Sequence, residues 1–229
     1  MYKQKINLNR RKFSDVRQER LPMKITAVLP QKRNANRSSV FIDGVFAFGV
    51  RNEDLASLSI APGREITRER LEALTAEKIY ADARESALKY LSARPRTFRE
   101  TVKRLEEYEY PSDVITRVME LLLKYNYIDD KQYAFDYSAS RLKSGKYGPR
   151  RVKNELKQKG VEADLIDEAF ENAASVYDET EAAREWLRKK RFSINEADAA
   201  GRKRVSDALA RRGFSWSAIR EALNGDEDE

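Results

Sequence analysis

A single pattern of residues recurs three times along this chain and constrains its fold more than any other feature. The copies at 152–166 and 205–219 each have a central Leu, a Gly four residues later and a second apolar pair beyond it. The copy at 101–115 is looser, because Glu109 and Tyr110 stand where the others have Gly and an apolar residue. The central Leu returns after 51 residues and again after 53, so we expect tandem units of about 50 residues.

Each copy has the spacing of helices. Apolar residues four apart predict one helix on each side of the turn residue. A further helical pattern lies upstream of each copy, at 87–91, 134–142 and 183–187. The unit is therefore three short helices, similar to a helix-turn-helix DNA-binding module. We predict a mainly α fold of three tandem three-helix (helix-turn-helix-like) repeats in an elongated curved body, the form that stacked repeats take.

A small β-rich segment precedes the repeats. Three β-prone runs lie at 25–29, 40–42 and 45–50. Asp43 and Gly44, between the last two runs, predict a hairpin with a type I′ turn. The polar residues 31–39 predict a loop between the first two runs. We therefore expect a small β-hairpin-containing N-terminal domain before the helices.

These patterns divide the chain into five segments. The first is a basic arm without sustained apolar periodicity, which we expect to be disordered. It is followed by the small β-rich domain, a linking helix with the first three-helix repeat, the second repeat, and the third repeat with an acidic tail. Their bounds are 1–22, 23–66, 67–129, 130–178 and 179–229.

The chain lacks His and Cys altogether. It therefore has no thiolate nucleophile, no imidazole base and none of the commonest ligands of transition metals. Asp129 and Asp130 are neighbours at a predicted helix start, where carboxylates cap the helix and offset its dipole. We expect a binding protein that is not an enzyme and holds no metal or cofactor. Since no apolar stretch reaches the roughly 20 residues of a membrane span, we also expect a cytoplasmic protein without a membrane anchor.

Charge is distributed in blocks. The 45 Lys and Arg exceed the 38 Asp and Glu by seven. Residues 141–160 have eight bases against one acid, and 184–212 have ten against four. Between them, 161–183 has eight acids and no base. This alternation, on the length scale of the repeat, predicts that repeats two and three each carry a basic face.

Two basic stripes fall at equivalent positions of these repeats. In the second repeat, Val152 and Leu156 are expected to face the core, which turns Arg150, Lys153 and Lys157 outward. A solvated helix face explains one such stripe, whereas two at equivalent positions favour a shared electronegative partner. The candidate binding residues are Arg141, Lys143, Lys146, Arg150, Arg151, Lys153, Lys157, Lys203, Arg204, Arg211 and Arg212.

Two runs carry a family resemblance. YIDDKQYAFDYSASR at 127–141 and GKYGPRRVKNELKQKGV at 145–161 resemble the signature of the bacterial RecX family, regulators of the RecA recombinase. The resemblance covers about residues 77–224, and 23–66 is similar to the N-terminal extension of some members. The first repeat departs from the family's pattern at Glu109 and Tyr110.

The resemblance implies a protein that binds along the helical groove of RecA filaments on single-stranded DNA. There it would restrain ATP hydrolysis, strand exchange and the stimulation of LexA cleavage, or promote filament disassembly. It would thereby regulate DNA repair, recombination and the SOS response. The resemblance also implies weak DNA binding, which we assign to the basic faces, and we expect a monomer.

A sequence-specific or architectural DNA-binding protein is the alternative. Arg150 and Arg151 lie early on a potential recognition helix, where Arg side chains can read bases. Tandem repeats with unequal basic blocks are, however, poorly suited to a symmetric operator.

Overall fold

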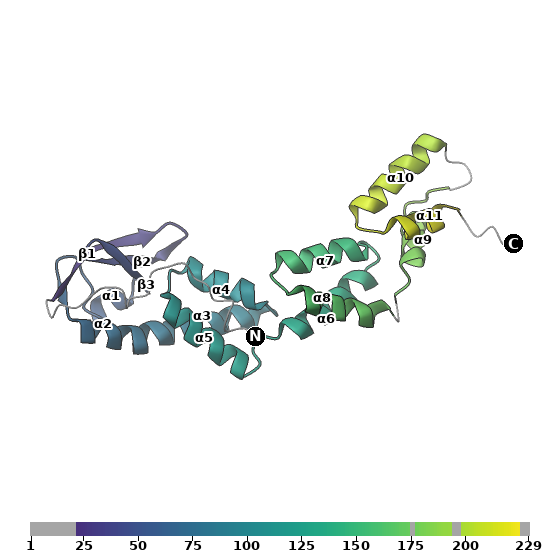
Figure 1. Ribbon diagram of the computed structural model, residues 1–229. Coiled ribbons are helices and arrows are strands. Elements are labelled where there is room, and N and C mark those ends of the chain that lie inside the picture. Colours follow the sequence, from purple (N-terminus) through teal and green to yellow (C-terminus); the bar gives the residue numbers. More distant parts are fainter. Residues whose placement is uncertain (1–21, 175–176, 194–197, 225–229) are drawn as a thin grey trace. The chain divides into compact units, whose positions relative to one another are not determined.

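The structure is a computed structural model of the 229-residue chain, and it describes residues 22–174, 177–193 and 198–224. It consists of two compact units, the first ending at Ile128 and the second beginning at Asp129 (Figure 1). The predicted basic arm, apart from Pro22, and the acidic tail at 226–229 lie outside the described residues. Every helix within the described ranges is too short or too polar to cross a membrane.

The first unit joins a four-stranded antiparallel sheet to the first three-helix repeat. Its strands are β1 (Met23–Gln31), β2 (Asn34–Ile42), β3 (Val45–Arg51) and β4 (Glu65–Ile66), in the order β3-β2-β1-β4. Its helical segments are α1 (Asp54–Ser57), α2 (Arg68–Leu74), the π-helical η3 (Thr75–Ile79), α3 (Tyr80–Ala93), α4 (Phe98–Glu107) and α5 (Ser112–Lys124). Since α2, η3 and α3 follow one another without a break, the predicted linking helix runs directly into the first repeat.

The predicted hairpin is confirmed. Ile42 of β2 pairs with Val45 of β3. Between them Asp43 and Gly44 have φ of +49° and +78°. A type I′ turn needs positive φ at both of these positions, which Asp and Gly adopt more readily than other residues.

The polar stretch 31–39, predicted to be a loop, is mostly strand. β2 begins at Asn34, and Arg37, Ser38 and Ser39 are buried within it. Ser38 donates a hydrogen bond of 2.8 Å to the side chain of Asn52, and Ser39 donates one to the carboxylate of Glu109. The prediction of a loop from polar composition was wrong here. A strand tolerates a buried polar group when the tertiary structure supplies a hydrogen-bond partner for it.

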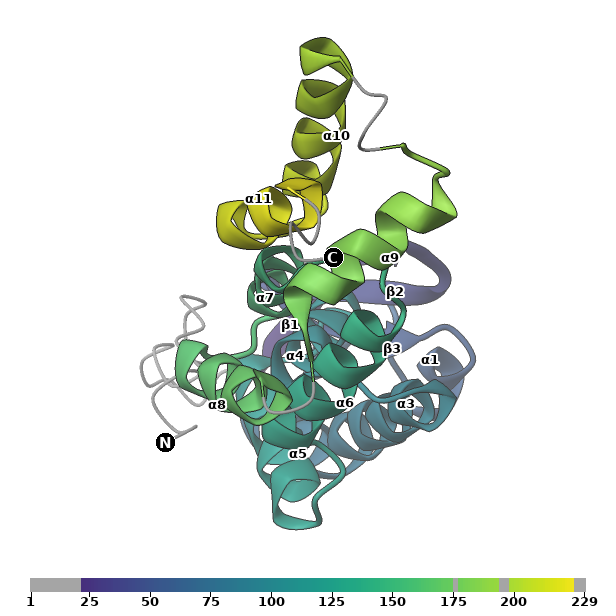
Figure 2. The ribbon, with the colours of Figure 1, turned by 90° about the vertical axis from the view of Figure 1, so that its right-hand side faces the viewer.

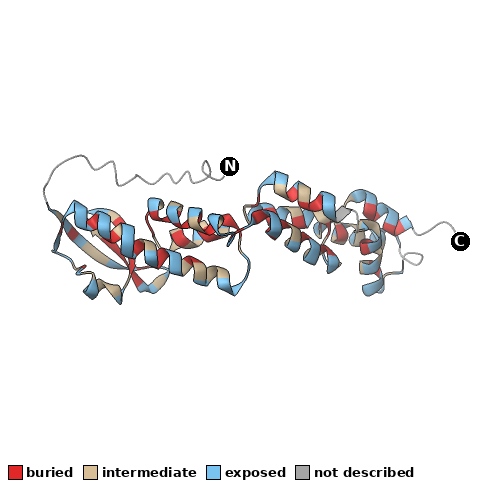
Figure 3. Cartoon of the chain, turned by 90° about the horizontal axis from the view of Figure 1, so that it is seen from below, coloured by how far each residue is buried: buried red, intermediate tan, exposed pale blue. Residues whose placement is uncertain are grey.

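One apolar core joins the sheet to the first repeat. Val40 and Phe48 of the sheet, Ala83 of α3 and Leu105 of α4 belong to the same cluster of buried side chains. Figure 3 shows the buried positions along the strands and helices of this unit. The first repeat is thus fixed to the sheet by apolar contact.

The second unit contains the second and third repeats. Its helices are α6 (Asp130–Lys143), α7 (Pro149–Gln158), α8 (Ala163–Ala174), α9 (Glu179–Lys189), α10 (Ala199–Arg211) and α11 (Trp216–Asn224). As predicted, Asp129 caps α6, accepting a hydrogen bond of 2.9 Å from the N–H of Gln132. In the third repeat α11 packs on both α9 and α10 (Figure 2). The two repeats have separate cores, built around the fully buried Leu156 and Leu209.

The same turn ends the middle helix of all three repeats. The turn residues Glu109, Gly160 and Gly213 have φ of +59°, +82° and +88°. In each case the N–H of the next residue donates to the carbonyl of the central Leu, over 3.3, 3.1 and 3.2 Å. This shared backbone arrangement, a helix end with a left-handed residue, confirms the three tandem three-helix repeats.

Candidate functional site

The second repeat presents the predicted basic stripe on α7. Val152 and Leu156 have no exposed surface, as the spacing predicts. Arg150 and Lys157 are exposed, whereas Lys153 is half-buried. The helix therefore has one apolar face toward the repeat's core and a basic face toward solvent.

Two of the predicted cations bind Glu155. Arg141 Nη2 lies 3.0 Å from Glu155 Oε2, and Arg151 Nε lies 3.2 Å from Oε1. Tyr137 donates its hydroxyl to the same carboxylate at 2.8 Å. Burial by itself would raise the pKa of Glu155, but the hydrogen bonds from Tyr137, Arg151 and Arg141 outweigh it and lower this pKa. The pair of Arg141 with Glu155 thus joins α6 to α7, whereas the pair of Arg151 with Glu155 lies within α7.

Aromatic rings cover the same cluster. Tyr133 is buried and stacks on Tyr137, with 5.8 Å between ring centroids. The guanidinium carbons of Arg141 and Arg151 lie 4.9 and 4.5 Å from the centroid of Tyr147. At these distances the rings attract the cations. These tyrosines therefore support the packing of the second repeat.

The charge of Lys153 is paired with a carboxylate on the neighbouring helix. Its Nζ lies 2.8 Å from Asp167 Oδ1 on α8, and 5.0 Å from the ring centroid of Phe170. This hydrogen bond lowers the pKa of Asp167. Of the three residues that the spacing turned outward, Lys153 is the one whose charge is already paired.

The predicted cations of the third repeat also divide into exposed side chains and side chains that contact their own repeat. Lys203 and Arg211 are exposed on α10. Arg204 is exposed too, and its Nε donates to the carbonyl of Ala200 at 3.3 Å. Arg212 donates to the carbonyl of Ala208 at 2.9 Å and lies 4.6 Å from the ring centroid of Trp186. Arg212 therefore packs within the repeat.

The eleven predicted cations fall into two groups. One group forms the side-chain contacts just given: Arg141, Arg151, Lys153, Arg204 and Arg212. The other group, here called the open cations, is exposed and has no side-chain hydrogen bond or ion pair to any residue that the structure describes: Lys143, Lys146, Arg150, Lys157, Lys203 and Arg211. Open cations on both repeats can bind an anionic partner without first breaking an ion pair.

Backbone hydrogen bonds join the two repeats that carry the open cations. The N–H of Gly148 donates to the carbonyl of Arg212 at 2.9 Å, and the N–H of Arg150 donates to that of Gly213 at 3.1 Å. A Cβ on Gly148 would lie 2.5 Å from the backbone of Gly213. The third repeat's turn therefore packs directly on the start of α7, where a recognition helix would otherwise approach DNA bases.

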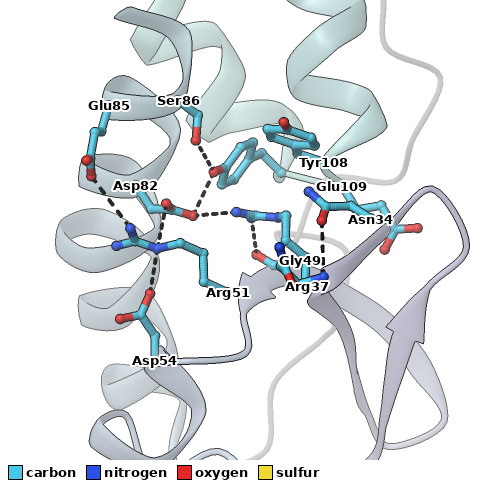
Figure 4. Close-up of polar contacts among 12 residues, drawn as sticks. Asn34, Arg37, Gly49, Arg51, Asp54, Asp82, Glu85, Ser86, Tyr108 and Glu109 are labelled. Atoms are coloured by element: carbon cyan, nitrogen blue, oxygen red, sulfur yellow. Dashed lines mark hydrogen bonds and ion pairs between the residues drawn. The ribbon is translucent and has the colours of Figure 1, made fainter. Parts of the chain in front are cut away.

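The first unit contains a buried polar cluster that no local sequence pattern predicts (Figure 4). Arg37 Nη1 lies 2.9 Å from Asp82 Oδ2, with both side chains almost fully buried. Arg51 Nε lies 3.1 Å from Asp82 Oδ1, and the Tyr110 hydroxyl donates to Oδ2 at 2.6 Å. Burial of this hydroxyl raises the pKa of Tyr110. The cluster joins β2 to α3 and to the turn of the first repeat, at positions too far apart in sequence for a local motif.

The fold and its basic faces define the class: a tandem three-helix-repeat protein behind a small antiparallel sheet. Four family models match the chain. They are described as the Regulatory protein RecX N-terminal domain (residues 23–67) and the first (83–122), second (129–169) and third (177–223) three-helix domains of RecX.

Individual relatives agree with these matches. The regulatory protein RecX of Lacticaseibacillus paracasei is 31% identical over 87% of this chain and 82% of its own. That of Clostridium acetobutylicum is 32% identical over 87% of this chain and 94% of its own. The chain belongs to the RecX family of regulatory proteins.

Solved structures show the same fold. A crystal structure of a regulatory protein RecX aligns with a TM-score of 0.59 and 26% identity, over 88% of this chain and 99% of the other. RecX from Lactobacillus salivarius aligns with a TM-score of 0.56 and 23% identity, over 64% of this chain and 96% of the other.

Proposed function

We propose that this protein binds the filament of RecA on single-stranded DNA, in its helical groove, and modulates RecA, mainly by inhibition. The reactions it lowers are ATP hydrolysis, strand exchange and the stimulation of LexA cleavage, in the cytoplasm, as part of the regulation of DNA repair and recombination. The observation that carries this proposal is the set of open cations on both repeats of the second unit, in a chain of the RecX family. A filament that carries nucleic acid offers these cations a continuous line of phosphates.

The protein would act by binding and not by catalysis. The sequence offers neither His nor Cys. Two adjacent carboxylates lie at the start of α6. One of them, Asp129, caps this helix, which explains its position without a catalytic role. A bound regulator needs only complementary shape and charge, which the repeats supply.

Sequence-specific reading of duplex DNA is less well supported. A recognition helix reads bases with residues of its first turn, which enter the major groove. In this protein the first turn of α7 is packed against Arg212 and Gly213 of the third repeat. The exposed side chains of the open cations, which are spread over both repeats, are suited to phosphates, whose contacts carry no sequence information.

Charge reversal of open cations tests the proposal. The triple variant Lys143→Glu, Lys146→Glu, Arg150→Glu should need at least about tenfold more protein to halve RecA ATPase on single-stranded DNA, because phosphate contacts become repulsive. The control variant Arg70→Glu, Lys89→Glu, Lys103→Glu has the same charge change at exposed residues of the first unit. It should inhibit like the wild type. Undiminished inhibition by the first variant would show that its cations do not bind the filament.

A binding titration separates the two candidate functions. Wild-type protein is titrated against RecA filaments and against bare duplex DNA of many sequences at the same salt concentration. We expect tighter binding to filaments and little discrimination among duplexes. Tight binding to one duplex sequence, with indifference to RecA, would replace the proposal by the alternative.

A further inference from the structure

One cation recurs at the same position of the middle helix in all three repeats. It is the sixth residue before the central Leu, and it is Arg99, Arg150 or Lys203. The aligned segments around it are 97–108, 148–159 and 201–212. No other position of these segments holds Lys or Arg in every copy. A charge that recurs while the charges around it vary indicates a task that the repeats have in common.

The recurring cation lies at the surface of every repeat. Arg99 is exposed on α4, as Arg150 is on α7 and Lys203 on α10. Within the part of the chain that the structure describes, Arg99 has no side-chain hydrogen bond, ion pair or ring contact. The acid next to it is engaged in the helix cap, because Glu100 Oε2 accepts a hydrogen bond of 3.2 Å from the N–H of Thr97. The guanidinium of Arg99 is therefore available to an anion.

Helix stability does not explain a cation at this position. Arg99 is the second residue of α4 and Arg150 the second of α7, and the dipole of a helix disfavours a cation in its first turn. Other groups stabilise these helix starts. Thr97 accepts a hydrogen bond of 3.1 Å from the N–H of Glu100, and the N–H of Arg150 is bound to the carbonyl of Gly213. The recurrence of the charge therefore points to a partner outside the fold.

We propose that the first repeat also binds the single-stranded DNA of the filament, and that Arg99, like its equivalents Arg150 and Lys203, binds a phosphate. A phosphate accepts either Lys or Arg, and a DNA strand offers the same group at regular intervals to a cation that recurs once in each repeat. The inference rests on the proposed function in taking DNA as the partner. It extends the binding surface to the first unit, since all eleven predicted cations lie in the second.

The salt dependence of oligo-dT binding tests the phosphate contact of Arg99. Arg99→Gln should flatten the slope of log affinity against log salt by about 0.7, the contribution of one phosphate of a single strand. Arg99→Lys should keep the wild-type slope, because it keeps the charge. The matched control is Lys89→Gln, which removes an exposed cation from α3 of the same repeat and should leave the slope unchanged. An unchanged slope for Arg99→Gln, or equal flattening by Lys89→Gln, would overturn the inference.

Photocrosslinking provides the second test. Because the chain has no Cys, Arg99→Cys introduces a single thiol that can be alkylated with an azidophenacyl crosslinker. On irradiation we expect a crosslink to labelled oligo-dT, as we do for Arg150→Cys. Lys89→Cys, treated in the same way, should give little product. Equal yields from Arg99→Cys and Lys89→Cys, or a crosslink from Arg99→Cys to RecA alone in complete filaments, would overturn the inference.

Two further readouts separate this inference from a structural role of Arg99 and from the proposed function. Arg99→Gln should not lower the urea midpoint of unfolding, because it removes a charge that opposes the helix dipole, and a lowered midpoint would overturn the inference. If Arg99→Gln weakens inhibition of RecA ATPase but leaves the oligo-dT slope unchanged, Arg99 binds RecA protein and the inference is wrong. The proposed function fails separately, if the wild type leaves RecA ATPase unchanged, and the oligo-dT slopes then still decide the inference.

Discussion

The carbonyl oxygen of Gly213 accepts a hydrogen bond of 3.1 Å from the backbone N–H of Arg150. This contact satisfies an N–H in the first turn of α7, which has no partner within its own helix. The corresponding turn of the first repeat is used in a similar way, since the carbonyl of Glu109 accepts from the N–H of Gly49 in β3 at 2.8 Å. In both units a glycine, Gly49 or Gly148, lets the backbone of the repeat's turn approach the backbone of a neighbouring element closely.

Two glycine substitutions should separate the cost of left-handed backbone strain from the cost of steric overlap between the two repeats. In Gly213→Ala the new Cβ would lie 2.3 Å from Arg151 N, and φ is +88°. We expect it to lower the free energy of unfolding of the second unit by about 2–5 kcal/mol, from left-handed strain plus overpacking. Gly148→Ala has ordinary φ but a 2.5 Å collision, and should cost about 1–3 kcal/mol. Both Trp lie in this unit, so urea unfolding followed by Trp fluorescence reports on it.

Gly145 provides the control for these variants. Its φ is +63°, and a Cβ there would meet Glu185 only at an ordinary 3.5 Å. Gly145→Ala should therefore show strain alone, about 1–2 kcal/mol. A Gly213→Ala variant no less stable than Gly145→Ala would mean that the close approach of the two repeats does not persist in solution.

The buried pair Arg37–Asp82 should be costly to break from one side. Asp82→Ala leaves the guanidinium of Arg37 buried without its carboxylate, and we expect a loss of about 3–5 kcal/mol from the free energy of unfolding of the first unit. Urea unfolding followed by circular dichroism, with hydrogen exchange of β2, measures it. Replacing both partners, as Arg37→Met with Asp82→Leu, should cost less than Asp82→Ala alone.

An exposed ion pair sets the scale for that result. Arg68 and Glu72 lie one helical turn apart, with Nε and Oε1 3.0 Å apart and side chains more than half exposed. Arg68→Ala should cost less than about 1 kcal/mol. If Asp82→Ala costs no more than Arg68→Ala, the cluster of Figure 4 is not a determinant of the first unit's stability.

The sequence predicted the fold wherever the signal was local. Asp43 and Gly44 specify their hairpin by themselves, and the spacing of Leu105, Leu156 and Leu209 places three helices in register. The prediction of a loop failed at strand β2, because the contacts that stabilise this strand come from residues distant in sequence. Arg37 is polar in sequence, and only Asp82, 45 residues away, makes a strand position suitable for it.

The candidate site was predictable to the same degree. The spacing of Val152 and Leu156 correctly turned Arg150 and Lys157 outward. It did not reveal that Lys153 is paired, because Asp167 lies on the next helix and its distance depends on how α8 packs. Periodicity gives the direction of a side chain, whereas its partner depends on tertiary structure.

Acid should weaken the second unit through Glu155. Its pKa is lowered from the ordinary 4.5, so its contribution to stability is complete above pH 4.5 and is lost as the pH falls through the folded-state value. At pH 7, Glu155→Gln should cost about 1.5–3 kcal/mol, since hydrogen bonds to a charged group are lost. Urea unfolding followed by Trp fluorescence at pH 7 and below pH 4 measures this difference, which should shrink in acid.

A second carboxylate of the same unit controls for general acid effects. Glu168 pairs with Lys131 at the surface, with side chains 42% and 52% exposed. Glu168→Gln should change the free energy of unfolding by less than about 1 kcal/mol at either pH. A Glu155→Gln deficit that stays constant from pH 7 to acid would contradict the linkage.

The salt dependence of DNA binding should distinguish open from paired cations. Each phosphate contact to a single strand contributes about 0.7 to the slope of log affinity against log salt. The variant Lys143→Gln, Lys146→Gln, Arg150→Gln should therefore flatten the slope for oligo-dT by up to about 2, because these side chains are exposed and have no partner among the described residues. Lys153→Gln should change it little, since Asp167 already holds that ammonium group. Fluorescence titrations at several salt concentrations measure both slopes, and equal flattening per residue would show that pairing does not decide which cations bind DNA.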